Sequence, residues 1–289
     1  MYNKSLGSKV FDGFNIAFMI LVAVITLYPL WFVLVASLSS NSEVLKSGGL
    51  MFWVKDFNVN AYKAVLFNSA IWNGYKNTII VVIAGTALNI LLTAIGGYFM
   101  SRKGVMLKPF ISIAIIFTMY FSGGTIPFYF TVRALHINDS LLSLILPVAI
   151  NTYNMIIMQT AFLGIPDSLE EAAKIDGARH SRILFSIMLP ICMPTIAVLI
   201  LYYGVSHWNS WFNAMIFIRN RELFPLQLIL REIVITNTIV EGSNDFGYES
   251  VGETIQYATM VVATLPVLLV YPFMQKYFVG GMMIGAVKG

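Results

Sequence analysis

Residues 165–190 read IPDSLEEAAKIDGARHSRILFSIMLP, and this stretch carries the most local information in the chain. Ser168 is followed three positions later by Glu171, which is the spacing of a capping box and predicts a helix start. Gly177 permits the left-handed conformation that ends a helix, so the first helix is expected to stop there. A second short helix over 179–188 should then end at the closing Leu-Pro pair. We predict a helix-turn-helix.

The sequence on either side of this stretch is apolar enough to cross membranes. Apolar residues make up 58% of the chain and charged residues 11%, whereas soluble domains carry about 25% charged residues. A helix needs about 20 apolar residues to span the hydrocarbon, and helices satisfy their own backbone groups there. The predicted spans are 14–38, 77–100, 109–130, 141–162, 191–217 and 254–277. We therefore predict an all-α polytopic membrane protein with six transmembrane helices in a single domain, 1–289, whose core covers about 72–280.

The basic residues of the short loops set the predicted orientation. Both termini and the loops that carry Arg102, Lys103 and Arg179 fall on one side, which the positive-inside rule places in the cytoplasm. The stretch 165–190 is then cytoplasmic. On the opposite side, 60–67 has the pattern of a short interfacial helix, and the apolar part of the long segment 219–253 is expected to pack.

Motifs for catalysis, metal binding and nucleic-acid binding are missing from the sequence. There is no P-loop, no H-E-x-x-H pair and no G-x-S-x-G, and Cys192 is the single cysteine. The net charge of +4 is spread over the loops, so no basic patch for nucleic acid is predicted. We expect no catalytic residue, no metal site and no cofactor bound by this chain.

On physical grounds alone, the helix-turn-helix at 165–190 could be a plain connector or a docking element. Its fixed positions resemble the EAA motif of binding-protein-dependent ABC importers, E-A-A-x-x-x-G-x9-I-x-L-P. The matching residues are Glu171, Ala172, Ala173, Gly177, Ile187, Leu189 and Pro190. The resemblance implies that the loop 163–190 is the coupling helix seated in a cleft of a separate ATPase subunit.

The C-terminus narrows the resemblance. Residues 275–289 are similar to the end of MalG-type carbohydrate permeases, whose tail closes with the same Gly-Ala-Val-Lys-Gly. This implies that the tail 278–289 contacts the ATPase subunits through Gly285, Ala286, Val287 and Lys288, although Met282-Met283-Ile284 departs from the usual Leu-Thr-Ala. Segments 121–127, 153–158 and 207–214 resemble the LplC/YtcP branch, which is associated with oligosaccharides derived from complex polysaccharides.

The resemblance also implies an assembly and a location. The expected fold is that of a type I (MetI-like) permease in the bacterial cytoplasmic membrane, with both termini in the cytoplasm. The expected partners are a second homologous permease subunit, most simply in a heterodimer, two ABC ATPase subunits that bind ATP and Mg, and an extracytoplasmic solute-binding protein. The transported molecule would be an oligosaccharide, and no nucleic acid is involved.

Polar residues inside the predicted spans are candidates for a sugar path. They should face the bundle interior or a cavity, because polar groups are costly in hydrocarbon. The candidates are Asn151, Asn154, Trp208, Asn209 and Asn213. Asn209 and Asn213 are four positions apart and would share a helix face. The alternatives are helix-to-helix hydrogen bonds for the asparagines and an interfacial belt for the tryptophan.

Two other functions compete with an ABC permease at this point. A secondary transporter driven by an ion gradient would need titratable residues within its spans, and the predicted spans contain essentially none. A membrane assembly protein without transport activity is the second alternative. Co-purification with an ATPase and vanadate-sensitive uptake would separate the three.

Overall fold

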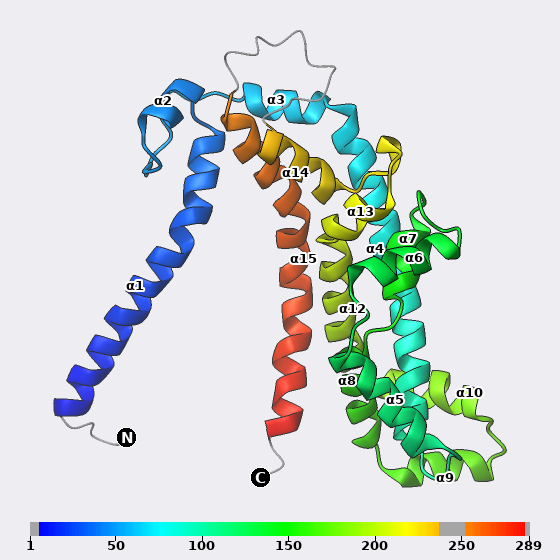
Figure 1. Cartoon of the computed structure of the whole chain (residues 1–289). Helices are drawn as coiled ribbons and strands as arrows, with labels where there is room; N and C mark the ends of the chain where they lie inside the picture. The colour runs from blue at the N-terminus through cyan, green and yellow to red at the C-terminus, as the bar shows by residue number, and fades with distance from the viewer. Residues whose placement is uncertain (1–5, 237–251, 287–289) are drawn as a thin grey trace. The chain divides into compact units, whose positions relative to one another are not determined.

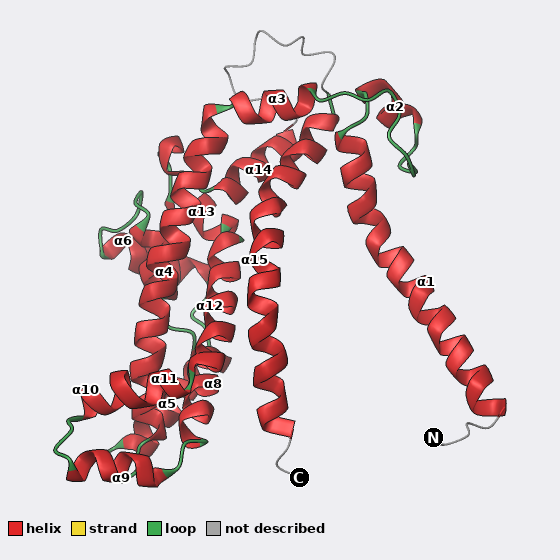
Figure 2. Ribbon diagram, turned by 180° about the vertical axis from the view of Figure 1, so that it is seen from behind, coloured by secondary structure: helices red, strands yellow, loops and turns green. Residues whose placement is uncertain are grey.

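The computed structural model describes residues 6–236 and 252–286, and all regular secondary structure within these ranges is helical (Figures 1 and 2). An isolated bridge pairs Ser39 with Phe57. The elements are α1 (Leu6–Ser37), α2 (Asn41–Lys46), α3 (Asn60–Phe67), α4 (Ser69–Ser101), α5 (Lys108–Tyr120), α6 (Thr125–Ala134), α7 (Leu142–Ile145), η1 (Leu146–Val148), α8 (Thr152–Leu163), α9 (Asp167–Ile175), α10 (His180–Ile183), η2 (Leu184–Met188), α11 (Leu189–Ile191), α12 (Met193–Trp208), α13 (Trp211–Phe217), η3 (Arg221–Leu223), α14 (Leu226–Thr236) and α15 (Thr254–Ala286). The predicted all-α class is confirmed.

The chain divides into two compact units by its internal contacts. The first combines Met1–Ser69 with Glu232–Leu265, and the second combines Ala70–Arg231 with Pro266–Gly289. The helices of the loop 163–190 and all three bent helix pairs belong to the second unit. The single-domain description of the whole chain stays a prediction.

In the first unit, α1 is a long apolar helix that buries little of its surface. Only 6% of its most apolar window is buried. Its last turns pack against the segment that follows, where the indole nitrogen of Trp31 donates to the Phe52 carbonyl at 2.8 Å. The buried cluster at this end consists of Val35, Ala36, Val44 and Met51. The remaining length of α1 presents its side chains outward, as a helix in lipid does.

The second unit is built on α4, a helix of 33 residues without a proline. A third of its most apolar window is buried. Gly97 allows α4 to approach α8 closely, because a Cβ at this position would lie 3.1 Å from the backbone nitrogen of Gln159 and from Met158 Cβ. That separation is shorter than ordinary van der Waals contact, so a side chain here would push the two helices apart.

Asn89 of α4 satisfies a backbone carbonyl that the break between η1 and α8 leaves open. Its Nδ2 donates to the Val148 carbonyl at 2.7 Å, and its Oδ1 lies 2.6 Å from His207 Nε2. Because Nδ2 is the donating atom, Oδ1 must accept, and His207 Nε2 carries the proton. The hydroxyls of Thr93 and Tyr203, 2.7 Å apart, form a second bond from α4 to α12. These bonds fix α4 to two broken segments.

Two of the predicted spans, 109–130 and 141–162, are sharply bent helix pairs rather than continuous helices. α5 and α6 meet at 117°, and the pair formed by α7–η1 and α8 meets at 52°. Gly124 begins α6 with φ +82°, a left-handed conformation that glycine adopts without strain. Pro147 lies in η1, and Asn151 starts α8 by accepting the Asn154 backbone N–H at 3.0 Å. These residues interrupt the helical hydrogen-bond ladder.

The predicted fifth span is also divided, between α12 and α13. At the break, Asn209 Nδ2 donates to the Val205 carbonyl at 2.9 Å, and Ser210 Oγ donates to the His207 carbonyl at 2.8 Å. The Val205 carbonyl also keeps its helical partner, the Asn209 N–H at 3.1 Å. The Trp211 N–H bonds instead to the Asn209 carbonyl at 2.9 Å, which leaves the His207 carbonyl to Ser210. Asn209 and Asn213 therefore lie on different elements, and the prediction that they share one helix face is wrong.

By length and apolar composition, α1 and α4 can each cross a membrane. Up to five spans result if each bent helix pair counts as one, and Thr254–Val270 of α15 is a further, shorter apolar helix. The predicted number of six spans stays a prediction.

The segment after α13 packs against α4, as its apolar residues predict. Leu226, Leu228 and Ile229 of α14 are all buried. Asp139 holds the chain where it leaves α13, because its Oδ1 accepts the backbone N–H groups of Asn220 and Arg219 at 2.8 and 2.9 Å. These two hydrogen bonds to the charged form lower the pKa of Asp139. The short helix predicted at 60–67 is α3.

Asn89→Leu is predicted to destabilise the second unit by about 1–3 kcal/mol, because it leaves the Val148 carbonyl and His207 Nε2 without partners. Thr86→Val is the matched control on the same helix, since the Thr86 hydroxyl is buried without a hydrogen-bond partner. Thermal unfolding in detergent should show a lower midpoint for the first variant only. Equal midpoints for both would refute the assigned role of Asn89.

Candidate functional site

The helix α9 begins at Asp167, one residue before the predicted cap. Pro166 occupies the N-cap position with φ −57° and ψ 133°, and no side chain caps the helix there. Ser168 is thus the second residue inside the helix, and the predicted capping box between Ser168 and Glu171 is wrong. The ring of Pro166 fixes an extended entry, after which Asp167 supplies the negative charge that favours a helix N-terminus.

The end of α9 is the turn that the sequence predicts. Gly177 has φ +77°. Its N–H bonds to the Lys174 carbonyl at 3.0 Å, and the Ala178 N–H bonds to the Ala173 carbonyl at 2.9 Å. This is the paired pattern of a Schellman motif. A Cβ at Gly177 would meet nothing within 4 Å, so the backbone conformation alone requires glycine here.

The second helix of the loop is longer than predicted. It continues through α10, the π-helical η2 and α11, and it meets α12 at 86°. The bend lies at Cys192, and Pro190 sits in the first turn of α11. Pro190 comes just after the π-helical η2, and such π-bulges occur where the helical hydrogen-bond ladder is disturbed. The prediction that this helix ends at the Leu-Pro pair is therefore wrong by a few residues, whereas the helix-turn-helix is confirmed.

The two faces of α9 differ in exposure. Glu170 and Ala173 are each 8% exposed and face the rest of the second unit. Glu171 and Ala172 are exposed, and the apolar Ile175 is 86% exposed at the end of the same helix. An exposed apolar side chain beside a carboxylate and a small residue is typical of a contact surface. Exposing apolar surface to water is unfavourable, and a bound partner would remove that cost.

An ion pair is buried beneath this surface. Arg102, just after α4, donates through Nη1 to Glu170 Oε2, and the two side chains are 9% and 10% exposed. The guanidinium also lies 4.8 Å from the centre of the Tyr98 ring. Lys174 Nζ contacts the other oxygen, Oε1, of Glu170 at 2.8 Å. Removing one partner from such a buried pair costs about 3–5 kcal/mol, because the other charge is left without compensation.

Two further contacts surround the buried pair. Tyr98 OH and His180 Nδ1 lie 2.9 Å apart, which attaches α10 to α4. Lys103 Nζ lies 2.6 Å from Asp167 Oδ2, but both side chains are exposed. The ammonium holds the pKa of Asp167 below its ordinary value through a hydrogen bond and its charge. This contribution is present above the ordinary pKa of an aspartate and is lost as the pH falls through the lowered one.

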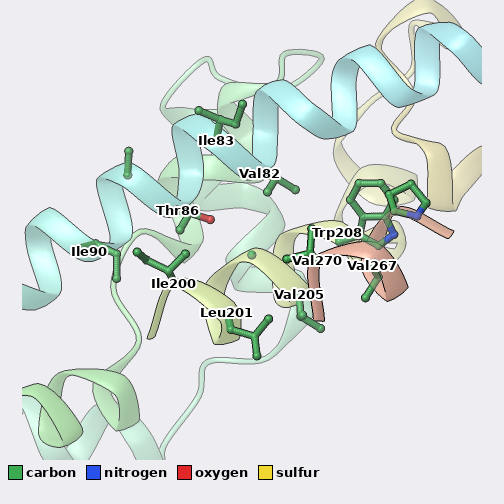
Figure 3. Close-up of a pocket in the computed structure, with 13 residues that line it drawn as sticks. Val82, Ile83, Thr86, Ile90, Ile200, Leu201, Val205, Trp208, Val267 and Val270 are labelled. Atoms are coloured by element: carbon green, nitrogen blue, oxygen red, sulfur yellow. The ribbon is translucent and has the colours of Figure 1, made fainter. Parts of the chain in front are cut away.

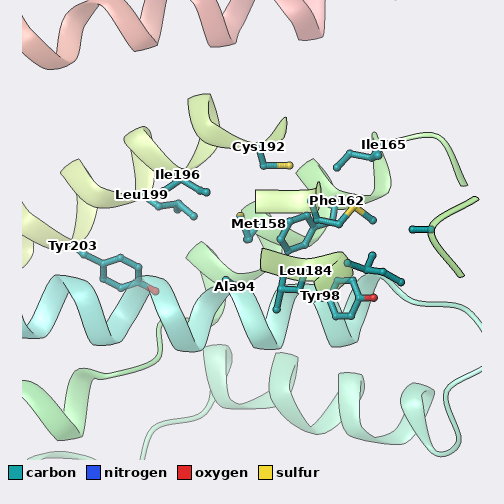
Figure 4. Packing of buried hydrophobic residues seen from close by; sticks show 13 residues of the cluster. Ala94, Tyr98, Met158, Phe162, Ile165, Leu184, Cys192, Ile196, Leu199 and Tyr203 are labelled. Carbon is teal, nitrogen blue, oxygen red and sulfur yellow. The ribbon is translucent and has the colours of Figure 1, made fainter. Parts of the chain in front are cut away.

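An apolar cluster supports the loop from the side of the helices (Figure 4). Phe162 of α8 and Ile183 of α10 are each 0% exposed, and Met188 is 1% exposed. Phe162 contacts Tyr98 edge to face, with ring centres 6.2 Å apart. α9 and α10 are therefore mounted on a packed core rather than hanging free from the helices.

The remaining residues of the predicted motif are distributed around this core. Ile187 and Leu189 are half-buried and pack against the apolar cluster, and Pro190 is exposed. Arg102 and Glu170 were not predicted to have a role. The signal that could have revealed them is an arginine directly after an apolar span, together with a second glutamate beside Glu171.

The predicted sugar-path residues do not form one cluster. Asn151 and Asn154 meet at the start of α8, where Asn154 is buried. Asn209 bonds to its own helix, Asn213 is half-buried on α13, and Trp208 lies beside Tyr75 with ring centres 6.3 Å apart. Of these five residues, only the first two share a hydrogen bond.

Trp208 lines a cavity of about 490 Å³ in the second unit (Figure 3). The lining residues are Val82, Ile83, Thr86, Ala87 and Ile90 of α4, Ile200, Leu201, Gly204, Val205 and Trp208 of α12, and Pro266, Val267 and Val270 of α15. The Thr86 hydroxyl and the Trp208 indole N–H are buried here without partners. A sugar needs many more hydrogen bonds than this lining offers, so the cavity does not support sugar contact by Trp208.

Two of the four residues predicted to contact the ATPase subunits through the tail lie within the described residues. Gly285 and Ala286 belong to the last turn of α15. Val287 and Lys288 lie outside the described residues.

The geometry of the loop can be compared with known proteins. Residues 105–284 match the family described as binding-protein-dependent transport system inner membrane component. The polygalacturonan/rhamnogalacturonan transport system permease protein YtcP of Bacillus subtilis is 37% identical over 98% of this chain and 99% of its own length. Protein LplC of the same organism is 36% identical over 100% and 98%.

A solved structure agrees with these sequence relatives. A chain in the crystal structure of a bacterial ABC transporter involved in the import of the acidic polysaccharide alginate has a TM-score of 0.88 and 30% identity, covering 96% of this chain and 100% of that one. A fold similar to that of this chain is therefore found in a subunit of an ABC importer.

Gly177→Leu is predicted to loosen the end of α9, because a side chain in the left-handed conformation costs about 1–2 kcal/mol. Amide hydrogen exchange in 170–178 should accelerate, while membrane insertion persists. Gly177→Asn is the control, since asparagine tolerates this conformation. Unchanged exchange in the leucine variant would contradict the Schellman assignment.

Proposed function

Because this chain belongs to the binding-protein-dependent transport system inner membrane components, we propose that it is one permease subunit of an ATP-driven importer for a carbohydrate. The observation that carries the proposal is the contact surface of α9, where Glu171, Ala172 and Ile175 stand exposed above the buried ion pair of Glu170. A surface held this firmly suits a task in which force is transmitted.

The partner for this surface is a separate ATPase subunit. The family name states dependence on a binding protein, and the chain itself has no P-loop with which to bind nucleotide phosphates. ATP and Mg therefore belong to the ATPase subunits, and this chain needs no cofactor of its own. The tail that includes Gly285–Lys288 is a second candidate contact with the same subunits.

The proposed mechanism uses α9 as a handle. When the ATPases close, they displace the exposed face of α9. The Schellman turn at Gly177 and the cluster around Phe162 make α9 and α10 move together, since both helices share this core. The displacement reaches α4 through Arg102 and reaches α12 through the bend at Cys192. Such a shift can alternate access between the two sides of the membrane.

The permease pathway requires a second subunit in this proposal. A relative with the same family fold is part of an ABC importer, and the broken helices of the second unit provide irregular backbone that is tolerated only inside protein or along a water-filled path. A heterodimer with a homologous permease is the simplest assembly. Two ATPase subunits bind its cytoplasmic side, and the solute-binding protein docks outside, near the segment that follows Phe217.

The proposed substrate is an oligosaccharide derived from a complex polysaccharide. YtcP is named for polygalacturonan and rhamnogalacturonan transport, and the importer of the solved structure takes up alginate. Both names point to acidic polysaccharides. Asn154 and Asn213 remain candidates for contact with the sugar, whereas the cavity beside Trp208 is too apolar for it.

The protein is placed in the bacterial cytoplasmic membrane as a multi-pass subunit. Both termini, together with the loop 163–190, are proposed to face the cytoplasm, because the short loops on that side carry the basic residues.

Uptake of sugar by right-side-out membrane vesicles tests the proposed function, and inside-out vesicles serve as the control. Vesicles that contain the chain, its co-purifying ATPase and a binding protein loaded with oligogalacturonate or oligoalginate should accumulate sugar only with internal ATP, and vanadate should stop uptake. Accumulation driven by an ion gradient without ATPase would instead identify a secondary transporter. No uptake in any arm, with no ATPase in the purified complex, would leave only an assembly role.

A further inference from the structure

In the second unit, α4 is a long continuous helix among three bent helix pairs. α4 runs for 33 residues without a proline, whereas three neighbouring apolar pairs bend by 117°, 52° and 86°. From Thr78 to Ser101, α4 extends for about 35 Å at about 1.5 Å per residue, which exceeds the hydrocarbon thickness of about 30 Å. A single rigid helix therefore joins the loop on one side of the membrane to the segment on the other.

The inner end of α4 is attached to α9 by a joint with little freedom. The Arg102 guanidinium is held at three places: by Glu170, by the Ser101 hydroxyl that accepts from its Nε at 3.0 Å, and by the Tyr98 ring. Both charged side chains are buried. A planar guanidinium held in this way fixes direction as well as distance, which an exposed lysine cannot do. We define this set of contacts as the inner joint.

The outer end of α4 is attached to backbone atoms of the segment 220–226. Asn77 Nδ2 donates to the carbonyls of Glu222 at 2.7 Å and Phe224 at 3.1 Å. Thr78 Oγ1 accepts the backbone N–H of Leu226 at 2.9 Å. Asn77 is 6% exposed and Thr78 is 1% exposed, so these bonds are shielded from water. We define this set as the outer joint.

At the outer joint, the backbones of α4 and of Leu226 are in close contact. A Cβ on Gly74 would lie 3.0 Å from Leu226 Cα and 3.2 Å from its nitrogen. Leu226 itself is 0% exposed. The segment therefore follows α4 when α4 moves, because backbone atoms of Leu226 lie against Gly74 together with the Ile229 side chain.

We propose that α4 is the rigid link that carries the state of the ATPases to the outer segment 220–226, with Arg102 and Glu170 as the positioning pair at its inner end. This inference rests on the proposed function, since α9 must contact an ATPase. According to this inference, nucleotide binding in the cytoplasm changes the exposure of the outer segment 220–226. Disrupting either joint should interrupt this coupling.

The test follows one reporter on the outer face of the complex with its ATPase subunits. Cys192 is replaced by alanine and Glu222, whose side chain is exposed, by cysteine. Labelling by a membrane-impermeant maleimide is timed with and without AMP-PNP and Mg. In the parent, nucleotide should change the rate by about five-fold or more, the lower range of allosteric coupling.

Glu170→Gln removes the buried carboxylate of the inner joint, and Thr78→Val weakens the outer joint by removing the acceptor for the Leu226 N–H while the two Asn77 bonds remain. Each is expected to reduce the nucleotide effect at least about two-fold. The double variant should show no larger loss than either single variant, because a link in series fails once. Thr78→Ser keeps the hydroxyl and should restore the effect.

Lys103→Gln is the matched control for the inner joint. It removes the neighbouring exposed pair with Asp167, which contributes little, and should keep the parental nucleotide effect. Should Glu170→Gln fail to assemble, the Thr78 variants alone decide, since they lie on the opposite side of the membrane from the ATPases.

The outcomes separate the inference from the function on which it rests. A parent complex that retains no ATPase would overturn the proposed function. A parent with a nucleotide effect that survives in both Glu170→Gln and Thr78→Val would overturn the role of α4 and leave the importer intact. Losses that add in the double variant would show two independent structural defects and would also overturn it.

Discussion

Backbone groups inside a membrane have no water to bond to, and this constraint governs the whole second unit. Three of its apolar segments break, and each break leaves carbonyls or N–H groups that a continuous helix would have used. Side chains replace those bonds: Asn89 supplies the donor for Val148, Asn151 caps α8, and Ser210 donates to the His207 carbonyl at the end of α12. Polar residues that look like candidates for substrate contact are therefore needed first to make the fold. The backbone hydrogen bonds of α4 are continuous, so its polar side chains can form hydrogen bonds with neighbouring elements.

The cytoplasmic loop divides its labour between two faces of one short helix. The buried face of α9 uses charge, through Glu170, Arg102 and Lys174, to fix its position. The exposed face presents Glu171 and Ala172 and ends with the apolar Ile175. A helix anchored only by apolar contacts could slide by a fraction of a turn, whereas a hydrogen-bonded charge pair has one geometry. Precision on the hidden side is what makes the exposed side useful as a contact surface.

The sequence was most informative where a local rule acts alone. Gly177 predicted a left-handed turn, and α3 and the all-α class followed from apolar pattern and composition. It failed where two rules compete: Ser168 fits a capping box, but the N-cap is Pro166, two residues earlier. Apolar content hid the breaks at Gly124 and Asn209, because hydropathy measures the tendency to enter the membrane and not helix continuity. Arg102 with Glu170 joins residues 68 apart in sequence, a pairing that no local pattern contains.

The contrast between α1 and α4 has a consequence for how the protein is made. α1 buries 6% of its most apolar window, so it can leave the translocation machinery and reside in lipid as soon as it is synthesised. α4 carries Asn89, Thr93 and Asn77, whose partners Val148, Tyr203 and Glu222 follow 59, 110 and 145 residues later in the sequence. During biosynthesis α4 must therefore wait with unpaired polar groups until the ribosome has made α12 and the segment beyond it. That interval is when a chaperone or a membrane protease has access to the nascent chain.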